Sequence, residues 1–247
     1  SLRTTAVRDG DHYVLNGTKR FITNAPEASI FTVMARTDQT KKGAGAISAF
    51  IVEAGTPGLS LGKIDKKMGQ KGAHTCDVIF DNCRVPAENI IGGKEGVGFK
   101  TAMKVLDKGR INIAAISVGV AERMLEDALR YACERKQFGK PIAEFQAIAF
   151  KLADMATRIE AAELLTQLAG DLKDRHQPMT TQGAMAKYYA SEVATWASNE
   201  AVQIFGGYGY TKDFPVEKFY RDSKLCTIGE GTSEIQKVVI SRNVLRE

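Results

Sequence analysis

Long hydrophobic runs and metal-binding motifs are absent from this sequence. No segment approaches the roughly 18 consecutive apolar residues that a membrane-spanning helix needs, and the first residues do not resemble a secretion signal. The cysteines form no CxxC pair, and no histidine stands at metal-ligand spacing from any of them. We therefore expect no membrane association, no metal site, and reduced cysteines that are buried as small apolar side chains in a cytosol-like compartment.

A strong excess of one charge is also lacking. The 247 residues include 34 lysines and arginines against 29 aspartates and glutamates, which gives a formal net charge of +5. The basic residues are scattered rather than gathered in a run, so no nucleic-acid partner is expected. With 44% hydrophobic and 26% charged residues, the composition is typical of a globular protein, and the length suits one large domain or two smaller ones.

The pattern of the sequence changes near residue 95. Residues 1–95 contain short strand-like segments separated by glycine, proline and aspartate, which indicates antiparallel β structure, either a small sandwich or an open barrel. Among them, His12–Leu15 is followed by Asn16–Gly17 and then by Thr18–Thr23, a pattern typical of a two-residue hairpin turn. Residues 96–247 instead carry apolar residues at helical spacing.

The second part of the chain is predicted to be a helical bundle. Apolar periodicity predicts long helices over about residues 99–136, 142–172 and 180–205, and shorter ones from 214 and over 234–245. Thr180 or Thr181 is expected to cap the third helix. Long helices with short breaks are typical of antiparallel bundles. The predicted fold class is therefore α+β, with an antiparallel β domain over 1–95 followed by an antiparallel helical bundle over 96–247.

Two segments combine cations or glycines in ways that suit ligand binding, although no GxGxxG, P-loop, HExxH or GxSxG motif is present. Arg135–Ile142 begins with cations at the end of a helix, where they either complement the helix dipole or clamp a phosphate. Gln203–Tyr210 is rich in glycine, so it forms either a helix cap and loop or a backbone that a ligand can approach closely.

Two further segments contain carboxylates. Ile228–Gln236 places Glu230 between two glycines just before a helix. The carboxylate there either favours the helix dipole, with Thr232 or Ser233 as cap, or stands exposed beside backbone N–H groups that suit an oxyanion. Leu106–Arg110 lies within a predicted helix, where its charges form a solvated patch or a buried Asp–Arg pair.

Taken together, the order and spacing of these four segments resemble the acyl-CoA dehydrogenase family. Three segments of the β part also match that family, namely Tyr13–Asn24, Phe50–Glu53 and Met68–Gln70. The resemblance covers essentially the whole chain, with residues 1–95 as the family's middle β domain and 96–247 as its C-terminal helical domain. Family members begin with a further helical domain, which we expect this chain to lack.

The resemblance implies an enzyme with a flavin cofactor. The implied activity is FAD-dependent α,β-dehydrogenation of an acyl-CoA thioester to the trans-2-enoyl-CoA, with electrons passed to an electron-transferring flavoprotein. It further implies a homo-oligomer, a dimer or a dimer of dimers (a homotetramer), in which the FAD site is shared across a subunit interface. A role in fatty acid metabolism is implied, in the cytoplasm of a bacterium or the mitochondrial matrix of a eukaryote.

The resemblance also assigns roles to individual residues. Glu230 matches the catalytic base that removes the α-proton, and its backbone N–H matches a group that holds the thioester carbonyl. Related branches of the family place the base where this chain has Gly109, so Glu230 is the implied base here. The implied cofactor-binding residues are Phe21, Thr23, Arg135, Phe138, Gln146, Gln203, Phe205, Gly206, Gly207, Thr232 and Glu234. The implied substrate-binding residues are Asp107, Arg110 and Gly231.

Three alternatives remain open at this point. The first alternative is an acyl-CoA oxidase or a flavin monooxygenase-like protein, which differs from a dehydrogenase in its base and in the access of oxygen to the flavin. The position of Glu230 between two glycines favours a dehydrogenase. A DNA-associated protein of the same fold needs a strong basic patch. A net charge of +5 spread over the chain does not favour this alternative. The isolated chain is inactive if half of its site lies in the missing domain. Gly229 stands where several straight-chain relatives carry tyrosine, which makes a branched or cyclic acyl group plausible.

Overall fold

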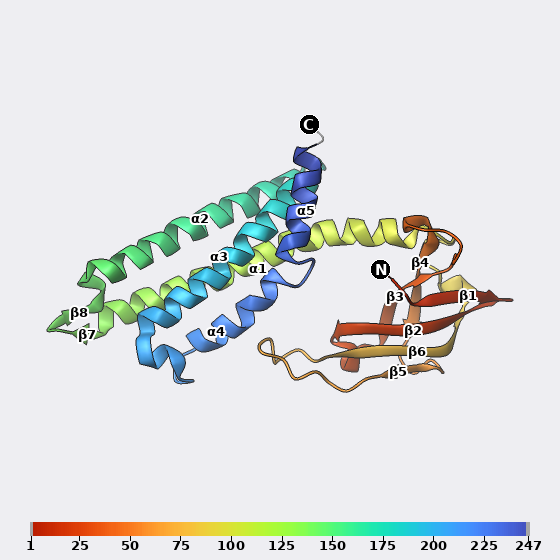
Figure 1. Ribbon diagram of the computed structural model, residues 1–247, viewed down its shortest axis with the longest axis horizontal. Helices are drawn as coiled ribbons and strands as arrows, with labels where there is room; N and C mark the ends of the chain where they lie inside the picture. Colours follow the sequence, from red (N-terminus) through yellow and green to blue (C-terminus); the bar gives the residue numbers. More distant parts are fainter. Residues whose placement is uncertain (1, 246–247) are drawn as a thin grey trace. The chain divides into compact units, whose positions relative to one another are not determined.

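The computed structural model describes residues 2–245, which form two compact units. One unit contains the residues up to Lys67 together with Lys71–Val105, and the other contains Met68–Gln70 together with the residues from Leu106 onward. Figure 1 shows strands β1–β6 in the first unit and helices α2–α5, with the short strands β7 and β8, in the second. The α+β fold class is confirmed, whereas the boundary between residues 95 and 96 stays a prediction.

The first unit is built on one six-stranded sheet. Its strands are β1 (Thr5–Asp9), β2 (His12–Thr23), β3 (Ile30–Arg36), β4 (Ile47–Glu53), β5 (Leu59–Leu61) and β6 (Thr75–Pro86), with short 3-10 helices η1 (Ala25–Glu27), η2 (Ala44–Ala46) and η3 (Ala87–Asn89). The order is β4-β3-β1-β2-β6-β5, and all neighbours are antiparallel except β1 and β3. A sandwich needs two sheets, so the single six-stranded sheet argues against the predicted sandwich.

The hairpin predicted at Asn16–Gly17 is wrong. Strand β2 runs through these residues, and the chain turns earlier, since Asp9 pairs with His12. Asn16 instead faces an irregularity in the pairing with β6, where the Asn82 N–H donates to Asn16 Oδ1 at 2.8 Å. The local turn signal was overridden because β6, far away in the sequence, offers a strand partner and a side-chain hydrogen bond at a β-bulge.

The core of the first unit follows the alternation of its strands. Leu15, Val33 and Phe50 are almost completely buried. The Tyr13 ring lies 4.9 Å from that of Phe50, and its hydroxyl donates to Glu95 at 2.7 Å. A buried phenol needs such a partner, so this hydrogen bond fixes the segment that leads into the first helix.

The second unit contains most of the helical structure. Its elements are α1 (Gly98–Glu134, whose first turns belong to the other unit), α2 (Gln146–Asp174), α3 (Thr180–Phe205), α4 (Val216–Ser223) and α5 (Ser233–Val244), with β7 (Lys136–Gln137), β8 (Lys140–Pro141), η4 (Ile142–Glu144), η5 (Gly206–Tyr210) and η6 (Lys224–Thr227). Helices α2 and α3 lie side by side (Figure 1). No helix among the described residues is long and apolar enough to cross a membrane.

Two helix starts differ from their predictions. Helix α2 begins at Gln146 rather than near Ile142, because Ile142–Glu144 forms a separate 3-10 turn after Pro141. Helix α3 has Met179 at its N-cap position, without a side-chain cap. Thr180 is instead the first helical residue, and its hydroxyl donates to Asp107 Oδ2 at 3.2 Å. This contact with α1 replaces the predicted capping role, and neither predicted threonine caps the helix.

Small side chains allow the helices to approach closely. The core positions of α3 are mostly alanines spaced three or four residues apart, which form one continuous stripe. The fully buried alanines of this stripe are Ala186, Ala190, Ala194, Ala197 and Ala201. The larger Met124 of α1 and Met155 of α2 complete the core that these helices share.

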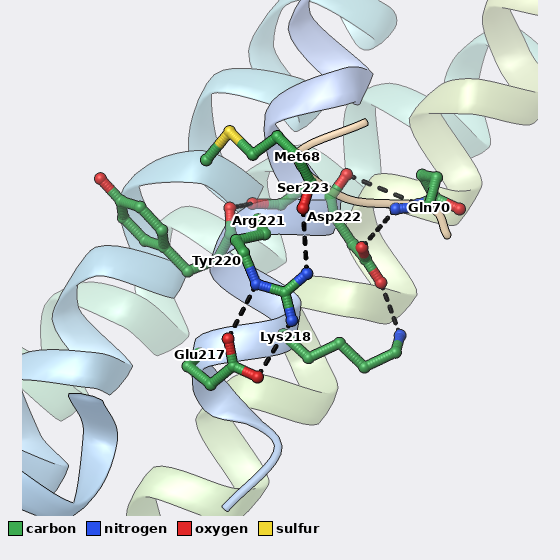
Figure 2. Close-up of polar contacts among 8 residues, drawn as sticks. All are labelled: Met68, Gln70, Glu217, Lys218, Tyr220, Arg221, Asp222 and Ser223. Atoms are coloured by element: carbon green, nitrogen blue, oxygen red, sulfur yellow. Dashed lines mark hydrogen bonds and ion pairs between the residues drawn. The ribbon is translucent and has the colours of Figure 1, made fainter. Parts of the chain in front are cut away.

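Three residues from the strand-rich half of the sequence, Met68–Gln70, pack on α4 (Figure 2). The Gln70 N–H donates to Asp222 Oδ1 at 2.6 Å, and Arg221 donates to the Met68 carbonyl at 3.0 Å. Burial opposes ionisation of Asp222, but the Lys218 ammonium and the Gln70 N–H outweigh it and hold the pKa of the carboxyl below its ordinary value. The segment is therefore fixed by charge-assisted hydrogen bonds.

Gly69 has no room for a side chain, which gives a test of this packing. A Cβ at Gly69 would lie 2.5 Å from the Arg221 carbonyl oxygen, so Gly69→Ala forces backbone to move. We expect the free energy of unfolding to fall by roughly 1–3 kcal/mol, measured by urea unfolding with circular dichroism. Gly72→Ala is the matched control, because nothing lies within 4 Å of its added Cβ. Equal midpoints for the two variants would contradict the packing.

Candidate functional site

Glu230 occupies an unusual backbone conformation in the loop between η6 and α5. Its φ is 53°, and that of Gly231 is 90°. The left-handed region is uncommon for a residue with a side chain and natural for glycine. The Gly229 N–H closes the preceding turn by donating to the Leu225 carbonyl at 2.8 Å. The chain therefore turns sharply at Glu230, and the glutamate side chain is exposed.

Two fully buried side chains hold the carbonyl groups of this turn. Lys187 of α3 donates from Nζ to the Gly231 oxygen at 2.7 Å. Gln236 of α5 donates from Nε2 to the same oxygen at 2.9 Å and to the Glu230 oxygen at 3.2 Å. Burial lowers the pKa of Lys187, whereas the charges of Cys226, Glu192, Glu230 and Glu234 act in the opposite direction.

The first residues of α5 are anchored as well. Thr232 is the N-cap, and its side-chain oxygen accepts from the Ile235 N–H at 3.4 Å. Of the two predicted caps, Thr232 is therefore the one observed. Ser233 is buried and donates to Glu192 of α3 at 2.6 Å. Together with the contacts of Lys187 and Gln236, these bonds fix both sides of the Glu230 turn.

The Glu230 carboxylate lies over Gly109 of α1. A Cβ built at Gly109 would be 2.7 Å from Oε2 of Glu230 and 3.3 Å from its Cδ. Within residues 2–245, no hydrogen-bond donor reaches this carboxylate, and the backbone N–H of Glu230 has no acceptor. An unbound carboxylate and an unbound N–H therefore stand next to each other, ready to contact a ligand.

The same turn of α1 carries the Asp–Arg pair that the sequence offered as one alternative, with Arg110 buried and Asp107 partly exposed. Arg110 is buried and donates to Asp107 Oδ1 at 2.6 Å. Its Nε is also buried and has no hydrogen-bond partner among the described residues. A buried donor without a partner is costly, so this arginine has hydrogen-bonding capacity left for a ligand or water.

A cleft of about 490 Å³ lies at the far end of α1. It is lined by Arg135, Phe205, Gly206 and Gly207, with Tyr131, Gln137, Ile142, Ile204, Tyr208 and Thr211. A Cβ added at either glycine would meet nothing within 4 Å, so the backbone here is open to a ligand. The cleft thus combines a guanidinium, an accessible backbone and aromatic walls.

Beside this cleft, Phe138 stands at the tip of the β7–β8 hairpin. Phe138 and Gly139 both have positive φ, 53° and 81°, as two-residue hairpin turns require. The Phe138 ring is 93% exposed and contacts only the edge of the Phe145 ring, with the centroids 6.0 Å apart. The sequence indicated only a break between helices here, and the hairpin is new. Cys133, in the last turn of α1, is exposed rather than buried as expected.

Phe21 and Thr23 lie on β2 of the other unit. Phe21 has a φ of 58° and is 67% exposed, next to an irregularity in the pairing with β6. The Arg20 guanidinium lies 4.4 Å from the Phe21 ring centroid and is itself held by Asp65 and Asp77. An aromatic face is thus displayed on a backbone that the sheet fixes.

The structure brings some predicted residues together and leaves others apart. Glu230 and Gly231 lie with Thr232 and Glu234 at the start of α5, and Asp107 and Arg110 lie on the turn of α1 that Glu230 covers. Arg135, Phe205, Gly206 and Gly207 share the cleft. Phe138, Gln146 and Gln203 are exposed and do not line it. Phe21 and Thr23 belong to the other unit.

Sequence reasoning missed Lys187 and Gln236. A signal for Lys187 exists, because this lysine follows Gly183, Ala184 and Ala186 on the apolar face of α3. A lysine on such a face is rarely buried without a specific partner. No comparable signal exists for Gln236, whose position in the first turns of α5 suits a surface residue equally well.

Comparison with known proteins agrees with this architecture. The family model described as acyl-CoA dehydrogenase, middle domain, matches residues 1–83, and the one described as acyl-CoA dehydrogenase, C-terminal domain, matches residues 96–245. The two matches together cover most of the chain, the strand-rich part by one model and the helical part by the other. The chain belongs to the acyl-CoA dehydrogenase family.

Individual relatives are similar over the whole chain. Acryloyl-CoA reductase (NADH) of Anaerotignum propionicum is 50% identical over 248 residues, and mitochondrial short-chain specific acyl-CoA dehydrogenase of Mus musculus is 50% identical over 243 residues. The alignments cover 100% and 98% of this chain but 62% and 58% of those relatives. A chain in a solved structure that describes the electron transferring flavoprotein of Acidaminococcus fermentans has a TM-score of 0.97 and 50% identity, with 100% of this chain and 64% of that chain covered.

The contact between Glu230 and Gly109 gives a direct test. Gly119→Ala, on the same helix with nothing within 4 Å of its Cβ, should raise the free energy of unfolding by roughly 0.5–1 kcal/mol through helix propensity. Gly109→Ala should raise the free energy of unfolding by less than Gly119→Ala does, because the added methyl group displaces the Glu230 carboxylate. Urea unfolding measures the difference, and a crystal structure of Gly109→Ala shows the carboxylate. An unmoved Glu230 with equal gains in stability would contradict the observed contact.

Proposed function

We propose that this chain carries the base and part of the flavin site of an enzyme that removes two hydrogens from an acyl-CoA thioester, forming the trans-2-enoyl-CoA with FAD as acceptor. The observation that carries the proposal is the Glu230 turn, where, among residues 2–245, no donor reaches the carboxylate and no acceptor reaches the adjoining backbone N–H. These are the two groups that α-proton removal next to a carbonyl requires.

In the proposed reaction, the Glu230 carboxylate accepts the proton from the carbon α to the thioester. The Glu230 N–H donates to the thioester carbonyl oxygen, which gains negative charge as that proton leaves. FAD, when bound, accepts the hydride from the β-carbon. Because both C–H bonds break in a fixed geometry, the rigid support of the Glu230 turn contributes to the rate by holding the base in place.

The residues of the chain suit FAD. Arg135 offers a planar fork for a pyrophosphate, and the open backbone at Gly206–Gly207 admits close approach. Phe21 displays an exposed aromatic face of the kind that covers a flat ring. Phe21 and Thr23 are proposed to contact the flavin ring, and the residues of the cleft, with Phe138, Gln146 and Gln203, to contact the adenosine and pyrophosphate portion.

The proposed enzyme is a homo-oligomer, and the length of α1 supports this. Gly109 and Glu134 are separated by about 38 Å along the helix axis, at the usual rise per residue. The Glu230 site and the Arg135 cleft therefore lie far apart within one chain. One FAD that serves the base at Glu230 must then obtain its Arg135 contact from another subunit, as in a dimer or a dimer of dimers.

The proposed partners and location follow from the family. Acyl-CoA is the proposed substrate. Its thioester and pantetheine portion is proposed to lie near Asp107, Arg110 and Gly231. The absence of a side chain at Gly229 is proposed to leave space beside the base for a branched or cyclic acyl group. The similarity to a chain from a structure on an electron transferring flavoprotein supports such a flavoprotein as electron acceptor. The bacterial cytoplasm or mitochondrial matrix is the proposed location.

Reduction of an enoyl-CoA is a second candidate direction, favoured by the 50% identity to an acryloyl-CoA reductase. The same residues serve both directions, since protonated Glu230 would return the proton to the α-carbon while hydride returns to the β-carbon. Anaerobic mixing of the FAD-loaded enzyme with saturated acyl-CoAs, and of its reduced form with enoyl-CoAs, compares the two rates. Rapid reoxidation of the reduced enzyme by O₂ would instead indicate an oxidase.

Removing the proposed base tests the mechanism. Glu230→Gln should retain FAD and still bind acyl-CoA, because the amide preserves volume and the backbone N–H. Flavin reduction should slow on the order of 10²–10⁴-fold, because the amide does not accept the α-proton. Stopped-flow absorbance measures the rate, with Glu122→Gln on the exposed face of α1 as control. Reduction of Glu230→Gln at the parental rate would end the assignment of Glu230 as base.

A second prediction concerns the cleft. Arg135→Ala should weaken FAD binding by roughly 1.5–3 kcal/mol, through loss of charge-assisted hydrogen bonds to the pyrophosphate. Acyl-CoA binding should change much less. Arg135→Lys keeps the charge but not the fork, so its FAD affinity should lie between the two. Fluorescence titration of apoprotein with FAD measures all three affinities, and unchanged values would remove Arg135 from the cofactor site.

A further inference from the structure

Lys187 is a buried cation whose presence the proposed chemistry does not yet explain. Its side chain has no solvent exposure in the middle of the apolar face of α3. Its described hydrogen bond is to the Gly231 carbonyl at 2.7 Å, and no carboxylate among residues 2–245 lies within 4.0 Å of its nitrogen. Burying an ammonium group whose hydrogen-bond partner is a neutral carbonyl is expensive, although Glu192, Glu230 and Glu234 offset part of that cost from a distance. A methionine or leucine at this position would avoid that cost, so the lysine serves another purpose.

The partner of Lys187 points to that purpose. Gly231 follows Glu230 directly, both residues have positive φ, and the Gly231 carbonyl accepts hydrogen bonds from Lys187 and Gln236. Gln236 contacts the same carbonyl through Nε2, but its buried Oε1 has no hydrogen-bond partner among the described residues. Only one end of this amide is therefore held by a hydrogen bond. Lys187 belongs to α3, whereas Gln236 belongs to α5. The Lys187 bond therefore ties the Glu230 turn to α3, whereas Gln236 ties it only to the helix that follows.

We infer that Lys187 is a positioning residue for the base: its bond to the Gly231 carbonyl holds the Glu230 turn so that the carboxylate lies over Gly109. The inference rests on the proposed function, in which Glu230 is the base. The left-handed conformation of Glu230 is unfavourable for a residue with a side chain, so it persists only where the surroundings determine it. Without the Lys187 bond, the turn relaxes and the carboxylate leaves the position from which it reaches the α-proton.

Stability and rate should respond differently if this is correct. An apolar side chain of similar length removes the desolvation cost of the buried ammonium group, and the Gly231 carbonyl keeps its bond to Gln236. Lys187→Met should therefore fold with little change in its unfolding midpoint. A misplacement of about 1 Å, by contrast, lowers a rate by up to about 10²-fold. If Lys187 only stabilises the fold, Lys187→Met should instead lower the unfolding midpoint and leave the reduction rate of the folded enzyme nearly unchanged.

The experiment compares three variants of the FAD-loaded holoenzyme. Lys187→Met removes the donor and the charge, Lys187→Gln keeps a shorter neutral donor, and Lys173→Met removes an exposed lysine at the end of α2 as control. Stopped-flow reduction by a series of acyl-CoA concentrations separates the limiting rate constant from the apparent Kd. Urea unfolding and a crystal structure of Lys187→Met give readouts that do not depend on activity.

The expected result is a limiting reduction rate about 10- to 100-fold lower in Lys187→Met, with the Kd for acyl-CoA and the unfolding midpoint nearly unchanged. Lys187→Gln should recover part of the rate, and Lys173→Met should match the parent. The crystal structure should show the Glu230 carboxylate displaced from Gly109. If Lys187→Met does not fold, Lys187→Gln decides by the same criteria.

Parental reduction rates in Lys187→Met and Lys187→Gln would overturn the inference. A rate that falls only together with the unfolding midpoint or with loss of FAD would overturn it as well, because Lys187 would then stabilise the fold alone. Glu230→Gln separates these outcomes from a failure of the proposed function. If Glu230→Gln reduces FAD normally, the base assignment is wrong; if it does not and the Lys187 variants do, only the positioning role is wrong.

Discussion

The backbone conformation of Glu230 is the constraint on which the site depends. A glutamate with a φ of 53° does not hold itself there, because its Cβ crowds the preceding carbonyl in the left-handed region. The turn is stabilised from outside, by side chains of α3 and α5 that bond to its carbonyl groups. Side chains of the helical bundle therefore hold the backbone of the Glu230 turn, although Glu230 itself lies on an exposed loop.

The length of α1 separates the Glu230 turn from the Arg135 cleft. One helix carries Gly109 beneath the Glu230 carboxylate and ends immediately before Arg135 of the cleft. A continuous helix has a fixed rise per residue, so the two regions cannot approach each other within one chain. A ligand that contacts both groups at one place therefore cannot take both from the same chain, which is the basis of the proposed homo-oligomer. The exposed Phe138 ring beside the cleft is consistent with an additional surface covering it.

Local sequence patterns predicted the helices well and the strand pairing less well. Apolar periodicity placed α1 and α3 within a few residues, because helical contacts are local in sequence. The Asn16–Gly17 pattern failed because Asn82 on a distant strand decides what happens there. Lys187 was missed for a related reason: its partner, Gly231, lies 44 residues further along the chain. The segments that contain Glu230 and Arg135 were recognisable from their residues, whereas the side chains that orient them were not.

The contact between positions 109 and 230 limits what this family can place at each of them. The Glu230 carboxylate occupies the volume that a side chain at position 109 would need, since a Cβ there would lie 2.7 Å from its oxygen. Glycine at 109 therefore leaves room for the Glu230 carboxylate, which a side chain at that position would displace. A carboxylate that originates at position 109 would reach the same region from the helix, and would require a small residue on the loop. If Glu230 is the base, as proposed, the carboxylate approaches the position over Gly109 from the loop rather than from the helix.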